Sequence, residues 1–113
     1  MRLRVREAWT ASYADPIRLS AGDAVVLDGR RDNWDGHWWL WGQAPDGRAG
    51  WLPDSLLEGS GGTPRARHDY SAMELTCRAG DLLDGLGATH GWTWCRASDG
   101  REGWVPDRCL GPA

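Results

Sequence analysis

Short apolar runs bounded by glycine and aspartate recur along the chain, for example at residues 24–27 and 81–86. Runs of this length between turn-forming residues are typical of β-strands. Asp46-Gly47 and Asp99-Gly100 each separate two such runs, and Asp-Gly favours a tight hairpin turn because it tolerates positive φ. No segment keeps an apolar period of 3.6 residues, so no helix longer than a turn or two is expected. The pattern therefore predicts an all-β fold of short strands.

The same motifs occur twice along the chain in the same order. Each copy carries a tyrosine, an Ala-Gly-Asp, a Trp-x-Trp and an Asp-Gly-Arg hairpin that leads into Gly-Trp-aliphatic-Pro-Asp. These motifs are Tyr13, 21–23, 39–41 and 44–54 in the first copy, and Tyr70, 79–81, 92–94 and 97–107 in the second. Because four markers recur in one order, the pattern indicates an internal repeat of whole folding units.

A linker is predicted between the copies. Residues 59–63, Gly-Ser-Gly-Gly-Thr, have no apolar side chain to bury and maximal backbone freedom. We therefore expect one domain at 1–58 and a second at 64–113. Several strands in about fifty residues must curl on themselves to enclose a core, so each copy is expected to form a small β-barrel. A core of this size is marginally stable on its own.

Composition and charge narrow the choice of partner. Nine tryptophans without any phenylalanine exceed what a core usually contains, so some of the rings should lie on the surface. The net charge is −3 and all thirteen basic residues are arginine. Because no broad cationic field exists to hold phosphates, a nucleic-acid partner is not expected.

The predicted location is cytoplasmic. The first residues lack the apolar run of a signal peptide, and no stretch has the length of a membrane span. An odd set of three cysteines argues against a closed disulfide framework and fits a reducing compartment. We therefore expect neither a membrane association nor export.

The second copy resembles the Src-homology-3 (SH3) family, including the bacterial variants that occur in tandem. Residues 66–70, ARHDY, resemble the ALYDY motif of the family, and residues 74–81, ELTCRAGD, resemble its ELxFxxGD stretch. Trp92 falls at the ligand-facing tryptophan, and residues 103–106, GWVP, match Gly-aromatic-aliphatic-Pro. In the more divergent first copy the corresponding positions are 11–13, 17–23, Trp39 and 50–53. The resemblance implies two SH3-like β-barrels in tandem.

It also implies a binding site for an extended peptide, usually a proline-rich one. A polyproline II segment is ordered before it binds, so flat aromatic walls hold it at a small entropic cost. An indole adds one N–H donor for a ligand carbonyl. The expected ligand-binding residues are a tyrosine, two tryptophans and a proline in each copy: Tyr13, Trp39, Trp51 and Pro53, then Tyr70, Trp92, Trp104 and Pro106.

The chain departs from the family at groove positions that are tyrosines in other members. In the second copy these positions are His68 and Cys109, and the Cys109 thiol is expected to be accessible. In the first copy they are Ala11 and Leu56. A peptide site follows from the resemblance, whereas a preference for PxxP ligands does not.

The first copy has a longer segment before its ligand-facing tryptophan. Residues 32–35, Asp-Asn-Trp-Asp, are expected to form a loop there, where members of the family set specificity. Asp32 and Asp35 could attract an arginine or lysine of a ligand. Trp34 and Trp38 either extend the binding face or cover the edge of this loop.

Each functional assignment has a structural alternative. Trp39 and Trp92 could simply cap a barrel, and Trp51 and Trp104 could pack inward. Cys77, Cys95, Cys109, His68 and His90 raise the possibility of zinc, but no Cys-x-x-Cys is present and the SH3 pattern places Cys77 and Cys95 in the core.

Two functions therefore remain open from the sequence. The first is a non-enzymatic peptide-binding adaptor without cofactors, since no nucleophile, base and oxyanion set can be assembled. The second is a structural subunit whose tryptophan-rich face packs on a folded partner or self-associates. In the first case the protein would be a monomer or a weak homodimer.

Overall fold

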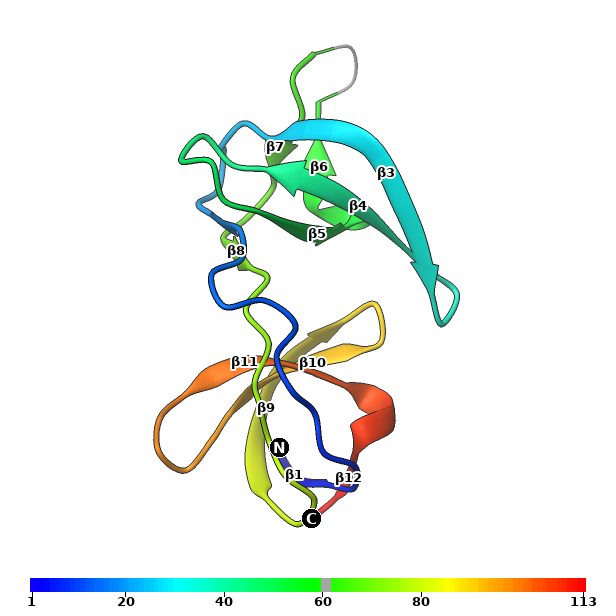
Figure 1. Ribbon diagram of the computed structural model, residues 1–113, viewed down its shortest axis with the longest axis vertical. Helices are drawn as coiled ribbons and strands as arrows, with labels where there is room; N and C mark the ends of the chain where they lie inside the picture. Colours follow the sequence, from blue (N-terminus) through cyan, green and yellow to red (C-terminus); the bar gives the residue numbers. More distant parts are fainter. Residues whose placement is uncertain (60–61) are drawn as a thin grey trace. The chain divides into compact units, whose positions relative to one another are not determined.

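The computed structural model describes residues 1–59 and 62–113, and these residues form an all-β protein (Figure 1). The strands are β1 (Arg2–Val5), β2 (Arg18–Leu19), β3 (Val26–Trp34), β4 (His37–Gln43), β5 (Ala49–Pro53), β6 (Leu57–Glu58), β7 (Arg65–Ala66), β8 (Tyr70–Ser71), β9 (Leu82–Thr89), β10 (Trp92–Arg96), β11 (Glu102–Pro106) and β12 (Leu110–Pro112). Two short 3-10 turns, η1 (Asp54–Leu56) and η2 (Asp107–Cys109), complete the described structure. The prediction of short strands without long helices is confirmed for the described residues. No helix among them combines the length and hydropathy that a membrane span requires.

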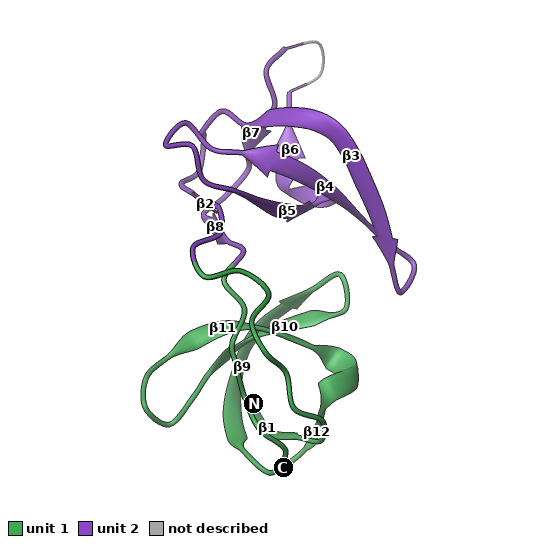
Figure 2. Ribbon diagram, in the orientation of Figure 1, with its two compact units in different colours: residues 1–14, 73–113 green, residues 15–72 purple. Residues whose placement is uncertain are grey.

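The chain divides into two compact units (Figure 2). Unit 1 consists of Met1–Ala14 and Met73–Ala113, and unit 2 consists of Asp15–Ala72. The sequence-based boundaries, 1–58 and 64–113, assign the first strand of each copy to its own copy. In the structure β1, from the first copy, lies in unit 1 with most of the second copy. In the same way β7, from the second copy, lies in unit 2 with most of the first copy. Because both copies start with a similar segment, the repeat could not show which pairing occurs.

Unit 1 is organised around a five-stranded sheet in the order β11-β10-β9-β1-β12. In this sheet β1 lies between β9 and β12, and the three strands can be followed in Figure 1. Leu3 on β1 lies opposite Leu83 of β9, and Val5 lies opposite Leu110 of β12. Period-2 alternation points these apolar residues into one core. The core of unit 1 comprises Leu3, Val5, Leu75, Cys77, Leu83, Cys95, Val105, Cys109 and Leu110.

Unit 2 contains a three-stranded sheet, β3-β4-β5, and two short ladders, β2 with β8 and β6 with β7. Leu52 on β5 is fully buried, and Ile17 is as well. A Cβ added to Gly42 would lie 2.7 Å from side-chain carbons of Leu52 and Val25, so glycine lets this core approach β4 closely. The other buried apolar residues of unit 2 are Leu19, Ala44, Leu56, Ala66 and Tyr70.

The Asp-Gly hairpins are confirmed. Between β4 and β5 the Ala44 N–H donates to the Arg48 carbonyl at 2.8 Å, and Gly47 has φ +92°. The turn between β10 and β11 repeats this geometry, with Gly100 also at φ +92°. Both are three-residue loops that need a left-handed residue at their last position, which glycine adopts without strain.

The pairing of the described strands leaves both units as open sheets, so the predicted closure into barrels is not present. β5 ends at Pro53 and β11 ends at Pro106, and each proline is followed by a 3-10 turn. Proline has no N–H to continue a ladder, and the turn redirects the chain. In the strand order, β5 is an edge strand of the sheet of unit 2 and β11 is an edge strand of the sheet of unit 1.

Candidate functional site

In unit 2 an aromatic face runs across β4 and β5. Trp39 lies directly opposite Pro53, and Trp41 lies opposite Trp51. Opposite residues and residues two apart share one side of a sheet, so these four side chains lie on the same face. Leu52 points to the other side and is fully buried. The strand period thus separates a core face from a half-exposed aromatic face.

The Trp41 and Trp51 rings form an edge-to-face pair on this surface. Their centroids are 5.1 Å apart and their planes meet at 75°. The Arg30 guanidinium lies 4.7 Å from the centroid of the Trp41 ring. Such contacts stabilise the ring positions by about 1 kcal/mol each. These contacts hold the Trp41 and Trp51 rings in place.

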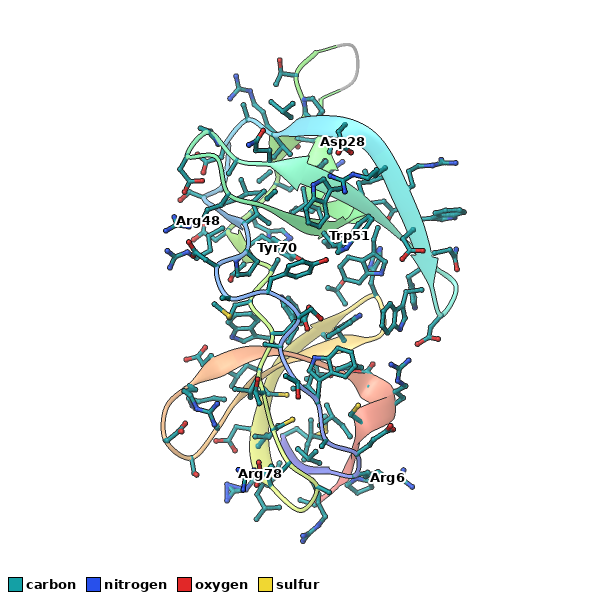
Figure 3. All side chains as sticks on the ribbon, viewed as in Figure 1. Arg6, Asp28, Arg48, Trp51, Tyr70 and Arg78 are labelled. Atoms are coloured by element: carbon teal, nitrogen blue, oxygen red, sulfur yellow. The ribbon has the colours of Figure 1, made fainter. Side chains whose placement is uncertain are left out.

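Tyr70 joins this face from β8. Its side chain is buried, and its hydroxyl donates a 3.0 Å hydrogen bond to the Trp51 carbonyl oxygen. Figure 3 shows Tyr70 and Trp51 side by side. The sequence grouped Trp39, Trp51 and Pro53 with Tyr13, but the tyrosine of this unit is Tyr70.

Unit 1 carries a matching aromatic face on β10 and β11. Trp92 lies opposite Pro106, and Trp94 lies opposite Trp104. The Trp94 and Trp104 rings are 5.2 Å apart at 77°, nearly the geometry of the pair in unit 2. All four side chains occupy one side of the sheet, because Cys95 and Val105 face the core. The structure therefore brings together three expected residues of the first copy (Trp39, Trp51 and Pro53) and three of the second (Trp92, Trp104 and Pro106).

Trp9 stands in unit 1 where Tyr70 stands in unit 2. Its N–H donates to the Cys77 carbonyl at 3.0 Å and its carbonyl accepts from the Cys77 N–H at 2.9 Å, as Tyr70 pairs with Leu19. The Trp9 ring packs edge-on against Trp92 at 5.4 Å. Tyr13, which the sequence aligned with Tyr70, also lies in unit 1 but is 43% exposed.

The alignment of Tyr13 with Tyr70 is therefore corrected to Trp9. Trp9 follows Val5 at the same spacing at which Tyr70 follows Ala66. In both copies an arginine comes directly after the small or β-branched residue, Ala66 or Val5. This spacing was the available signal for Trp9. It was missed because Tyr13 preserved the residue type and Trp9 did not.

Glu74 holds the segment that carries Trp9. One of its carboxylate oxygens, Oε1, accepts hydrogen bonds of 3.0 Å from the Trp9 indole N–H, the Ser12 backbone N–H and the Ser12 hydroxyl. Hydrogen bonds to a charged acceptor are stronger than neutral ones. Glu74 thus orients the aromatic residue that lies against Trp92.

The two faces differ in charge. In unit 1 the Trp94 indole N–H donates to Glu102 Oε1 at 2.8 Å. In unit 2 the equivalent Trp41 lies beneath Arg30, and Ala49 occupies the position of Glu102. Trp92 is only 8% exposed, whereas Trp39 is half-buried. The unit 2 face is the more open of the two.

The expected loop at residues 32–35 is instead the end of a long hairpin. Asp32 pairs with Trp39, and Trp34 pairs with His37, so β3 and β4 continue to the turn. Asp35 (φ +54°) and Gly36 (φ +84°) form the two-residue turn, a conformation that Asp-Gly favours. The prediction of a loop was wrong because this third Asp-Gly was not recognised as a hairpin turn.

The hairpin places its aromatic residues on two different sides. Asp32 shares the side of Trp39 and extends the aromatic face. Trp38 points to the opposite side, is 45% exposed and lies 5.0 Å from the Arg31 guanidinium carbon. Asp32 is therefore placed to contact a ligand that lies on Trp39, whereas Trp38 is not.

All three cysteines lie in the core of unit 1. Cys77 and Cys95 are buried as expected, but Cys109 is 1% exposed and not accessible as predicted. The residue is turned inward by η2, where the sequence pattern suggested a groove position. Among the described residues, no group of His, Cys, Asp or Glu side chains is arranged to hold a metal ion.

We predict that these thiols resist modification in the folded protein. Burial raises the pKa of Cys77 and Cys109, and it raises the pKa of Cys95 to about 11. At pH 8 roughly one Cys95 in a thousand is then a thiolate, the reactive form. A chromogenic disulfide reagent should label the native protein slowly and all three cysteines rapidly in denaturant. Rapid labelling of native Cys109 would contradict its burial.

The acidic residues of the hairpin turns have a structural role. Asp46 accepts from the Arg48 N–H at 3.0 Å and forms a 2.8 Å ion pair with its guanidinium. Asp99 makes the same contacts with Arg101. These hydrogen bonds lower the pKa of both carboxyls. The aspartates thus stabilise the turns.

Comparison with known proteins supports the assignment of the fold. A protein-family model described as a variant SH3 domain matches residues 2–59, slightly more than half of the 113-residue chain. The match covers the first copy of the repeat, from β1 to β6. No curated protein and no solved structure matched the chain.

Proposed function

The chain belongs to the variant SH3 domain family, and from this premise we propose that it is a non-enzymatic module whose aromatic faces bind an extended segment of a partner protein. Domains of this family are generally non-catalytic and commonly mediate protein interactions. The proposed site in unit 2 is Tyr70, Trp39, Trp51 and Pro53. The proposed site in unit 1 is Trp92, Trp104 and Pro106, with Trp9 beside Trp92; Tyr13 lies in the same unit and is 43% exposed.

The pairing of Trp39 with Pro53 carries this proposal. It places a large flat ring and a rigid pyrrolidine side by side on the sheet surface, next to the edge-to-face Trp41–Trp51 pair. Ridges of this kind fit the grooves of a polyproline II helix, which has no internal hydrogen bonds and little entropy to lose. Rigid aromatic side chains also lose little entropy on binding. A proline-rich segment is therefore the proposed ligand.

Unit 2 is the principal site in this proposal. Trp39 is half-buried, whereas Trp92 is 8% exposed and packs edge-on against Trp9. Asp32, opposite Trp39, adds a negative charge at the margin of the site. A basic residue in the ligand would gain specificity and on-rate from it more than affinity.

The test is a titration of the full chain with proline-rich peptides, monitored by the ¹H–¹⁵N signals of the nine tryptophan indoles. Saturable shifts at Trp39, Trp41 and Trp51 are expected. For the tightest peptide, Trp39→Ala should weaken binding roughly 30-fold, the effect of losing about 2 kcal/mol at an aromatic anchor. Trp92→Ala should weaken it far less.

Trp38→Ala is the matched control, because Trp38 lies on the same strand but points to the opposite side of the sheet. It should leave the dissociation constant nearly unchanged. If no indole moved at millimolar peptide, the peptide-binding proposal would fail. A folded protein partner would then be the remaining candidate for the aromatic faces.

A further inference from the structure

Val5 anchors β1 to unit 1 through the turn that precedes β9. The Val5 N–H donates to the Asp81 carbonyl at 2.8 Å, and the Val5 carbonyl accepts from the Gly80 N–H at 2.7 Å. In the next position the Arg6 N–H donates to the Cys109 carbonyl at 2.7 Å. These bonds tie the first strand of the chain to the turn before β9 and to η2, both formed by the second copy of the repeat.

Ala66 makes the same set of bonds in unit 2. Its N–H donates to the Asp23 carbonyl at 3.0 Å, and its carbonyl accepts from the Gly22 N–H at 2.8 Å. The Arg67 N–H then donates to the Leu56 carbonyl at 2.9 Å. Gly22-Asp23 and Gly80-Asp81 belong to the repeated Ala-Gly-Asp motif, so the two strands occupy equivalent places.

The two copies of the repeat have therefore exchanged their first strands within one chain. Each unit accepts a strand that is remote in sequence from the rest of its sheet, held by the same backbone bonds. Such bonds do not depend on which molecule supplies the strand. We propose that unit 1 is a strand acceptor, and that a second copy of this chain can supply its β1 to the position between β9 and β12. The inference does not rest on peptide binding.

The acceptor is specific for a strand of the β1 pattern. In β1 exposed and buried residues alternate, with Leu3 9% exposed and Val5 1% exposed. Leu3 lies opposite Leu83 on one side and Pro112 on the other. Without β1, both β9 and β12 would expose unpaired backbone groups and an open core, which favours capture of another strand.

Energetics determine when the exchange between molecules occurs. The strand makes the same contacts whether it comes from its own chain or from another, so the two arrangements differ mainly in the effective concentration of the donor. Within one chain that concentration is on the order of millimolar for a flexible connection. The wild-type chain should hence remain monomeric at micromolar concentration, and exchange should become dominant once the internal donor is disabled.

Two damaged chains that complement each other test this proposal. Val5→Asp disables the donor strand but leaves the acceptor intact, whereas Leu83→Asp disables the acceptor but leaves β1 intact. Both changes lie in unit 1, so the indole signals of Trp39, Trp41 and Trp51 in unit 2 should persist in each variant. Alone, each variant should be monomeric and lack the native Trp92 signal.

After equimolar mixing and joint refolding, we expect a heterodimer by light scattering and a native Trp92 signal from one unit 1 per dimer. As a control, Val5→Asp is mixed with a chain that carries both substitutions and so has no donor. That mixture should stay monomeric. If the first mixture behaved as the sum of its separate components, the proposal would be overturned.

A synthetic peptide of residues 1–14 gives an independent measurement should the refolded mixture precipitate. Added to the full Val5→Asp chain, it should restore the Trp92 signal saturably. The same peptide with Val5→Asp should not. Failure of the wild-type peptide to restore the signal would show that unit 1 does not accept a separate strand.

Discussion

Gly103→Ala should destabilise unit 1 by about 3 kcal/mol, the upper part of the range for overpacking a closely packed site. A Cβ at this position would lie 2.7 Å from the Glu74 carbonyl carbon and from the Leu75 nitrogen. Both are backbone atoms of the neighbouring segment, which is tied to β11 by a 3.0 Å bond from the Leu75 N–H to the Trp104 carbonyl. The contact cannot be relieved by rotating a side chain, so the backbone must separate.

Gly87→Ala is the matched control on the same sheet. Apart from Gly87 and its two chain neighbours, no atom of the described residues lies within 4 Å of the Cβ that it would add, and alanine is better than glycine inside a strand by about 0.5–1 kcal/mol. The control should therefore be neutral or slightly stabilising. Equal effects of the two substitutions would show that the close approach at Gly103 does not exist.

Hydrogen exchange measures where Gly103→Ala acts. The Val5 amide, which donates to the Asp81 carbonyl at 2.8 Å, should lose protection together with the rest of unit 1. The Ala66 amide, which donates within unit 2 to Asp23, should keep its protection. If protection were lost at Ala66 and kept at Val5, the strand exchange seen in the structure would be wrong.

Most of the local structure could be predicted because it depends on local chemistry. Asp46-Gly47 and Asp99-Gly100 form turns because glycine provides the left-handed residue, and the following arginine is held by the aspartate. The aromatic faces could be predicted because opposite residues of a hairpin share one side of the sheet. Trp39 with Pro53, and Trp92 with Pro106, follow directly from this rule.

The assignment of the first strands could not be predicted for the opposite reason. Residues 2–9 and 65–70 meet equivalent backbone partners, and the sequence repeat that identifies the copies makes their first strands interchangeable. The choice depends on long-range packing of Val5 and Ala66 in different cores, which no local pattern encodes. Trp9 was missed for a different reason, because Tyr13 preserved the residue type of Tyr70 whereas Trp9 preserved only its spacing.

The exchange also changes how the candidate sites are built. Tyr70 contributes to the site of Trp51, and Trp9 contributes to the site of Trp92, so each site combines residues from both copies of the repeat. Cutting the chain within residues 59–63 would hence separate the members of both sites. A fragment that contains the family match, 2–59, lacks Tyr70, and peptide-binding experiments should use the full chain.

Leu52→Ala should destabilise unit 2 by about 2–5 kcal/mol, the range for truncating a buried leucine. Leu52 is fully buried, and its side chain fills the space next to Gly42, so the substitution leaves a cavity at the centre of the sheet. Val26→Ala, at a position that is 66% exposed on β3, should cost less than about 1 kcal/mol. Both changes are measured by denaturant unfolding of the full chain.

The amides that lose protection in Leu52→Ala identify the strand that completes unit 2. In the exchanged structure the Ala66 amide belongs to the destabilised unit, and the Val5 amide belongs to the other unit. Ala66 should therefore exchange with solvent faster by a factor that matches the loss of stability, roughly tenfold for every 1.4 kcal/mol, while Val5 stays protected. If the Val5 amide lost its protection instead, each copy would have to retain its own first strand. The composite sites described for Trp51 and Trp92 could then not form.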